Sequence, residues 1–84
     1  MTKTDNRVAI GKRIQELRVE AGFTQQRFAA MVGISRGSYS DIERGERGFS
    51  VDVLHRIVRA FGLTYTEFFS GIDGAETMLK NSKR

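Results

Sequence analysis

The stretch GISRGSYSDIERG, residues 33–45, concentrates side chains that can exchange hydrogen bonds with a ligand. Arg36 carries a planar fork of donors that matches a pair of acceptors such as guanine O6 and N7. Ser38 and Ser40 can donate to bases or to phosphates, and Asp41 can accept from an amino group such as cytosine N4. These residue types at this spacing indicate recognition of a polar ligand.

The same stretch is a weak helix former by intrinsic propensity. Gly in a helix interior costs about 1 kcal/mol relative to Ala, and Ser competes for backbone hydrogen bonds. Tyr39 and Ile42 nevertheless have helical spacing and predict a helix that Ser35 caps. A helix selected only for stability would carry Ala, Glu, Lys or Gln at exposed positions. Slim residues beside Arg36, with Gly37 leaving room, instead suit a helix that enters a DNA major groove about 12 Å wide.

Glycines divide most of the chain into short amphipathic helices. The expected helices run from about Asn6 to Glu20, through QQRFAAMV after a Thr24 cap, from a Ser35 cap to Gly45, through VDVLHRIVRAF after a Ser50 cap, and through YTEFFS after a Thr64 cap. The apolar residues expected to face the core are Ile10, Ile14, Leu17, Ala21, Phe28, Ala29, Val32, Ile34, Tyr39, Ile42, Val51, Leu54, Ile57, Val58, Phe61 and Phe68. The sequence therefore predicts one all-α domain.

The connection between the second and third expected helices is very short. Only Ile34 lies between Gly33, which ends one helix, and Ser35, which caps the next. A connection this short makes the two helices cross steeply, and the small side chain of Ala29 allows them to approach closely. Two short helices, a Gly-containing turn and an unusually polar second helix are typical of a helix-turn-helix.

Four polar side chains flank the second helix of this pair. Gln25 and Gln26 follow a cap at a helix N-terminus, where exposed N–H groups favour anions. Arg44 and Arg47 lie at the end of the second helix and in the loop that follows. Because half or more of protein–DNA hydrogen bonds go to the backbone, we expect these four side chains to contact phosphates.

Composition sets outer limits on the function. The 84 residues suffice for one small domain, and 14 Lys and Arg against 10 Asp and Glu give a net charge of +4. This excess favours anionic partners, although charge alone does not separate nucleic-acid binding from simple solubility. The chain has no Cys and a single His, so thiolate and paired-His metal sites are excluded, and we expect neither a metal nor another cofactor. No apolar run approaches the roughly 20 residues of a membrane span, and no signal-like segment opens the chain, which predicts a cytoplasmic protein with no membrane partner.

Residues 11–69 resemble a known family through the combined pattern TQxxFAxxVGIS and YSxIERG. The segment is similar to the five-helix DNA-binding domain of the phage repressor and Cro family, which includes the controller proteins of restriction–modification systems. The resemblance implies a lambda-repressor-like helix-turn-helix domain over residues 1–70. It leaves residues 71–84 as an extension that is partly disordered or forms one short helix.

The resemblance also implies roles for individual residues. In similar proteins the equivalents of Gln25 and Ser35 hold phosphates. The base-facing positions, taken with the chemistry above, are Arg36, Gly37, Ser38, Ser40 and Asp41. A docking geometry of this kind is the one known for phage repressors, whose second helix lies in the major groove.

Two further residues match a structural pair of the family, and two positions depart from its pattern. Arg18 and Glu43 match a partly buried salt bridge that ties the first helix to the recognition helix. Gly37 is unusual at a base-facing position. Phe49 stands where relatives commonly have Pro, which predicts an aromatic contact on the core in place of a rigid loop.

The predicted function is sequence-specific binding of double-stranded DNA by a transcriptional regulator. One domain offers few base-reading side chains, so we expect a homodimer on a pseudo-palindromic operator. The predicted dimer surface consists of Leu63, Tyr65, Thr66 and Phe69, whereas Phe68 is expected to close the core. A restriction–modification controller and a Cro-like repressor both fit. The sequence does not distinguish an activator from a repressor. Asp52 is a candidate contact for RNA polymerase, although a solvent-exposed acid is the simpler interpretation of this residue.

Two other classes of function fit parts of the pattern. A protein-interaction module such as an antitoxin can keep the same fold, but it has no need for Arg and slim polar residues together on the recognition face. A nuclease using Asp41, Glu43 and Glu46 would need a cleft with a cluster of His, Lys and acid, and the sequence indicates none. The sequence therefore predicts a binding protein and not an enzyme.

Overall fold

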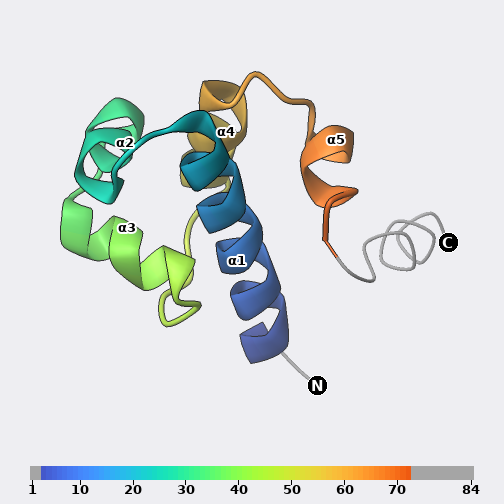
Figure 1. The fold of residues 1–84 in the computed structure, drawn as a ribbon. Coiled ribbons are helices and arrows are strands. Elements are labelled where there is room, and N and C mark those ends of the chain that lie inside the picture. Colours follow the sequence, from blue (N-terminus) through green and yellow to red (C-terminus); the bar gives the residue numbers. More distant parts are fainter. Residues whose placement is uncertain (1–2, 73–84) are drawn as a thin grey trace, which may run out of the picture.

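The computed structural model describes residues 3–72, and these form five helices. Their bounds are α1 (Lys3–Ala21), α2 (Gln25–Val32), α3 (Arg36–Glu43), α4 (Val51–Ala60) and α5 (Tyr65–Phe69). Figure 1 shows α2 and α3 on one side of α1 and α5 on the other. The described residues contain no strand, and none of their helices has the length and apolarity needed to cross a bilayer. The predicted all-α, five-helix fold is confirmed.

Short polar side chains begin the last four helices, as the sequence predicted. The four N-caps are Thr24, Ser35, Ser50 and Thr64, each accepting a hydrogen bond from the backbone N–H three residues further on. Thr64 and Glu67 complete a reciprocal capping box at the start of α5. Because each cap satisfies an N–H that the helix leaves open, it fixes where the helix starts.

Gly33 makes the turn between α2 and α3. Its φ of 79° lies in the left-handed region, where residues with a Cβ are strained. The N–H of Gly33 donates to the carbonyl of Ala30 at 3.2 Å, and that of Ile34 donates to the carbonyl of Ala29 at 3.1 Å. These bonds end α2 and direct the chain into α3 within three residues.

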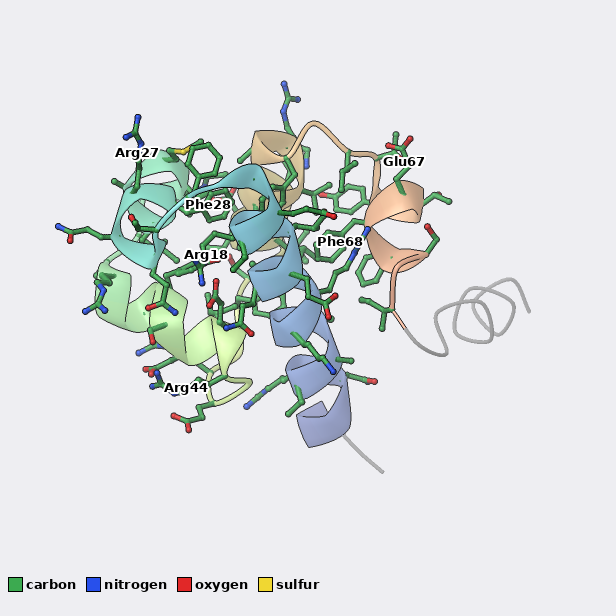
Figure 2. All side chains as sticks on the ribbon, in the orientation of Figure 1. Arg18, Arg27, Phe28, Arg44, Glu67 and Phe68 are labelled. Atoms are coloured by element: carbon green, nitrogen blue, oxygen red, sulfur yellow. The ribbon has the colours of Figure 1, made fainter. Side chains whose placement is uncertain are left out.

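The core lies where all five helices meet. Its buried members are Ile14, Phe28, Ala29, Val32, Tyr39, Ile42, Ile57, Val58, Phe68 and Ile72. Phe28 is central to it: its ring stacks on Phe61 at 4.7 Å and meets the ring of Tyr39 edge-on at 5.5 Å. Figure 2 shows Phe28 and Phe68 both directed into the body of the protein. Phe49 packs against this core, as the sequence predicted.

The structure corrects three details of the predicted helices. The first helix begins at Lys3 and not near Asn6. Ala21, expected on the apolar stripe, is exposed because it is the last residue of α1, where the chain turns away. Val51 is 79% exposed because it opens α4 just outside the core, although its spacing matches the buried stripe.

The predicted C-terminal extension lies almost entirely outside the described residues. Ile72 is the last described residue, and it is buried on the core. The packed body therefore includes Ile72, whereas the predicted domain ends at residue 70. The short helix considered within residues 73–84 concerns residues that the structure does not describe.

Helix α1 crosses the end of α3 at backbone distance. A Cβ atom placed on Gly11 would lie 2.4 Å from the carbonyl oxygen of Ile42 and 2.6 Å from that of Glu43. Both contacts are with backbone atoms, so no side-chain rotation relieves them. The closeness of α1 and α3 therefore depends on the missing side chain at Gly11.

Gly11→Ala is expected to lower the free energy of unfolding by about 1–3 kcal/mol, because a methyl group must be forced between two helices. Gly37→Ala is the matched control, since a Cβ there meets nothing within 4 Å. That substitution is expected to stabilise the protein by about 0.5 kcal/mol through helix propensity. Urea denaturation followed by circular dichroism measures both values, and equal stabilisation by the two substitutions would refute the close approach.

Candidate nucleic-acid interface

Helix α3 has a buried side and an outer side. Tyr39, Ile42 and Glu43 are buried against the body of the protein. The outer side carries the predicted base-contacting residues, of which Arg36 and Gly37 are exposed and Ser38, Ser40 and Asp41 are half-buried. The division explains how a helix of poor formers is kept in place: the buried side supplies the packing that the outer side lacks.

The carboxylate of Glu43 is the centre of the buried side. Arg18 of α1 donates from Nε to Oε2 at 2.7 Å and from Nη2 to Oε1 at 3.3 Å. Gln25 of α2 donates from Nε2 to Oε1 at 2.9 Å, and the Tyr39 hydroxyl donates to Oε2. The ion pair implied by the family resemblance is thus present, with side-chain exposures of 11% for Arg18 and 2% for Glu43.

The environment of this cluster fixes its protonation. Burial raises the pKa of Glu43, but hydrogen bonds from Arg18, Tyr39 and Gln25 outweigh burial and hold the pKa below its ordinary value. The hydrogen bond to Glu43 raises the pKa of Arg18. Burial, followed by the hydrogen bond to Glu43, raises the pKa of Tyr39 well above its ordinary value. Glu43 is therefore ionised and Tyr39 is a neutral donor at neutral pH.

The hydroxyls on the outer side of α3 make contacts close along the chain. The Ser35 hydroxyl donates to Oγ of Ser38 at 3.0 Å, and the N–H of Ser38 donates back to Oγ of Ser35 at 3.1 Å. Ser40 Oγ accepts from Nη1 of Arg44 at 2.6 Å. Ser35 thus acts as the cap of α3.

The predicted phosphate-contacting side chains have different surroundings. Gln26 is exposed, whereas Gln25 is half-buried and turned toward Glu43. Arg44 is bonded to Asp41, and Nε of Arg47 lies 3.8 Å from Oδ2 of Asp41. In Figure 2, Arg44 lies at the end of α3 away from the core. The structure brings these two arginines together around one carboxylate.

Two arginines that sequence reasoning missed hold neighbouring helices together. Arg56 of α4 donates from Nη1 to the Val32 carbonyl at the end of α2, at 2.8 Å. Its Nη2 donates to Asp52, the candidate polymerase contact, at 2.6 Å. Arg13 of α1 donates from Nε to the Phe68 carbonyl of α5 at 2.7 Å. The two carbonyl partners, Val32 and Phe68, lie 24 and 55 residues away in sequence, so no local pattern identifies these contacts.

The predicted dimer surface lies on and before α5. Tyr65 and Thr66 are exposed, and Leu63 and Phe69 are half-buried beside the core. Nδ1 of His55 on α4 lies 2.7 Å from the Tyr65 hydroxyl, which fixes that side chain against α4. Phe68 is fully buried and closes the monomer core, as expected.

Comparison with known proteins assigns the class. A family model described as helix-turn-helix matches residues 14–68. Control protein C.MunI of Mycoplasma sp is 36% identical over 70 residues, covering 82% of this chain and 95% of that protein. The regulator PuuR of Escherichia coli strain K12 is 33% identical over 67 residues, covering 80% of this chain and 36% of PuuR, so the chain spans about a third of that relative.

A solved structure agrees with this assignment. The restriction–modification controller protein C.AhdI from Aeromonas hydrophila matches with a TM-score of 0.73 and 29% identity, over 77% of this chain and 98% of that chain. The chain therefore belongs to the helix-turn-helix family of DNA-binding transcriptional regulators. The structure is consistent with this class, because Glu43, the central acid of the alternative nuclease, is buried in the Arg18 ion pair.

Glu43→Gln is expected to lower the free energy of unfolding at pH 7 by about 3–5 kcal/mol, because Arg18 is left as an uncompensated buried charge. Since folding lowers the pKa of Glu43, its contribution is complete above the ordinary value of 4.5 and is lost as pH falls through the lower folded value. Stability curves of the variant and the wild type should therefore converge below that pH. Glu46→Gln, at an exposed acid, is the control and should change stability by less than about 0.5 kcal/mol. Parallel curves for wild type and Glu43→Gln would contradict the assignment.

Proposed function

We propose that this protein is a dimeric, sequence-specific regulator of the controller or Cro type, which binds a pseudo-palindromic operator in double-stranded DNA. The observation that carries the proposal is the outer side of α3. Exposed and slim residues gather there, whereas the opposite side is locked by the Glu43 cluster. A helix held this firmly on one side can present the other to a groove in a fixed orientation.

Base reading is assigned to the N-terminal and middle turns of α3. Arg36 is exposed in the first turn, and its donor fork suits guanine O6 and N7. Gly37 has open space at its Cβ position, so the α3 backbone can approach a base edge there. Ser38, Ser40 and Asp41 complete the proposed base-contacting set.

Phosphate contacts are assigned to both ends of the motif. Gln25, Gln26 and Ser35 lie at or next to the N-termini of α2 and α3, and Arg44 and Arg47 lie at and beyond the end of α3. Gln25 uses one amide hydrogen on Glu43, which leaves its second for a phosphate. Contacts on both sides would fix the register of α3 without carrying sequence information.

Dimerisation is proposed through Leu63, Tyr65, Thr66 and Phe69. Aromatic side chains are enriched in interface cores, and Tyr65 is both exposed and held in place by His55. In Figure 1, α5 lies across α1 from α3, so a partner docked there leaves the recognition helix free. The similarity to the control protein C.MunI and to the structure of the controller protein C.AhdI supports a controller-type regulator.

Selection of bound duplexes from a random pool at 0.15 M salt, about physiological ionic strength, is expected to yield one pseudo-palindromic sequence. Arg36→Ala should weaken binding to it by about 1–3 kcal/mol and relax the preference at one base pair of each half-site. Arg59→Ala, at the exposed last turn of α4, removes the same charge away from α3 and should leave the preference intact. If Arg36→Ala weakens all sequences equally, Arg36 contacts phosphate and the base assignment is wrong.

Thr66→Arg is expected to convert the dimer into a monomer, because a charge is placed in the proposed interface without touching the core. Gln15→Arg adds the same charge on an exposed site of α1 and should leave the dimer intact. Sedimentation equilibrium at micromolar concentration, with and without the selected duplex, measures the mass. A wild-type protein that is monomeric both free and on that duplex would refute the dimer.

A further inference from the structure

The segment expected to read DNA carries no net charge. Residues 36–47 contain three arginines and three acids, although the whole chain has a net charge of +4. Glu43 belongs to the buried cluster, whereas Asp41 lies on the outer side of α3 and Glu46 is exposed in the loop that follows. Proteins gain affinity for any DNA by neutralising phosphates with Lys and Arg. Two acids at such a surface lower that general affinity.

Asp41 lies between the two arginines that are assigned to phosphates. Nη2 of Arg44 donates to Oδ1 of Asp41, and Nε of Arg47 lies 3.8 Å from Oδ2. The Arg44 fork is further held by Ser40 Oγ at 2.6 Å and by Glu46 Oε1 at 3.4 Å. About half of each arginine side chain remains exposed. Both arginines are therefore paired with Asp41 at the surface, and its carboxylate competes with a phosphate for them.

We propose that Asp41 determines specificity by holding Arg44 and Arg47 in the free protein and releasing them to phosphates only where a base offers an amino group to its carboxylate. This inference rests on the proposed function of α3. The amino groups of the right chemistry in the major groove are cytosine N4 and adenine N6. At other base pairs, the Asp41 carboxylate would have no hydrogen-bond donor from a base. It would then be repelled by the phosphates and by the acceptor atoms of the bases.

The shape of α3 leaves room for such a base edge. Residues four apart on a helix are neighbours on one face, so Gly37 lies one turn before Asp41. A Cβ atom on Gly37 would meet nothing within 4 Å. A side chain at position 37 would stand between the approaching base and the carboxylate. Gly37 and Asp41 thus act together: the glycine leaves space for a base edge, and the carboxylate one turn further on accepts its hydrogen bond.

The test compares Asp41→Asn with Asp52→Asn, which removes the same charge from an exposed acid on α4 that pairs with Arg56. Affinities are measured for two duplexes: the sequence selected by the wild-type protein and a scrambled duplex of equal length and composition. Asp41→Asn is expected to bind the scrambled duplex about fivefold more tightly than Asp52→Asn. The slope of log affinity against log salt concentration should also be steeper, by about the amount that one additional phosphate contact gives. Its ratio of selected to scrambled affinity should fall about 5- to 150-fold, the discrimination of one base contact.

A second comparison tests whether the effect of Asp41→Asn on DNA affinity requires Arg44 and Arg47. In a protein that already carries Arg44→Ala and Arg47→Ala, Asp41→Asn should affect scrambled DNA no more than Asp52→Asn does. The inference is overturned if the two Asn variants change both affinities equally, or if the effect of Asp41→Asn persists without the two arginines. Circular dichroism of each variant verifies folding.

The selection experiment separates the proposed function from the role of Asp41. A wild-type protein that selects no sequence refutes the proposed function, and the unchanged ratio that then follows also refutes a specificity role for Asp41. A wild-type protein that selects a sequence, with a ratio untouched by Asp41→Asn, refutes only the inference.

Discussion

The carboxylate of Glu43 accepts hydrogen bonds from three helices, and the geometry of the interface depends on it. Arg18 joins it to α1, Gln25 to α2 and Tyr39 to its own helix. A buried carboxylate is costly unless every acceptor site is used, and here both oxygens are engaged twice. The hydrogen bonds that compensate the burial of the carboxylate also fix the angle between α2 and α3. The same contacts therefore stabilise the buried charge and set the geometry of the motif.

This anchoring frees the outer side of α3 from any duty to stabilise the fold. An isolated helix of eight residues is unstable in water, even with good helix formers. Because Tyr39, Ile42 and Glu43 supply the packing, the outer positions can be chosen for size and hydrogen bonding alone. Gly37 and the serines weaken the helix as such. They are tolerated because the buried side is strong.

Local features of the fold follow from the sequence, and non-local ones do not. The caps, the Gly33 turn and most of the core were predictable, because each depends on residues within one helical turn of one another. Val51 was placed wrongly because periodicity cannot tell where along a stripe the core ends. The close approach at Gly11 and the carbonyl contact of Arg56 depend on how helices pack, which spacing along the chain does not encode. The Arg18–Glu43 pair came from family resemblance, since a last-turn acid is unfavourable by the helix dipole alone.

The neutrality of residues 36–47 changes how affinity must be distributed over the molecule. A recognition helix rich in unpaired Lys and Arg side chains would bind any DNA strongly, so that the base sequence would change the affinity little. Here the arginines next to α3 are matched by Asp41 and Glu46, so general attraction from this segment is weak. In the proposed dimer, useful affinity would then come from amide and backbone donors at the starts of α2 and α3 and from the second copy of the domain. For such a dimer, weak attraction at each α3, combined across two half-sites, would make occupancy depend on sequence and on protein concentration together, which suits a regulator controlled by its own level.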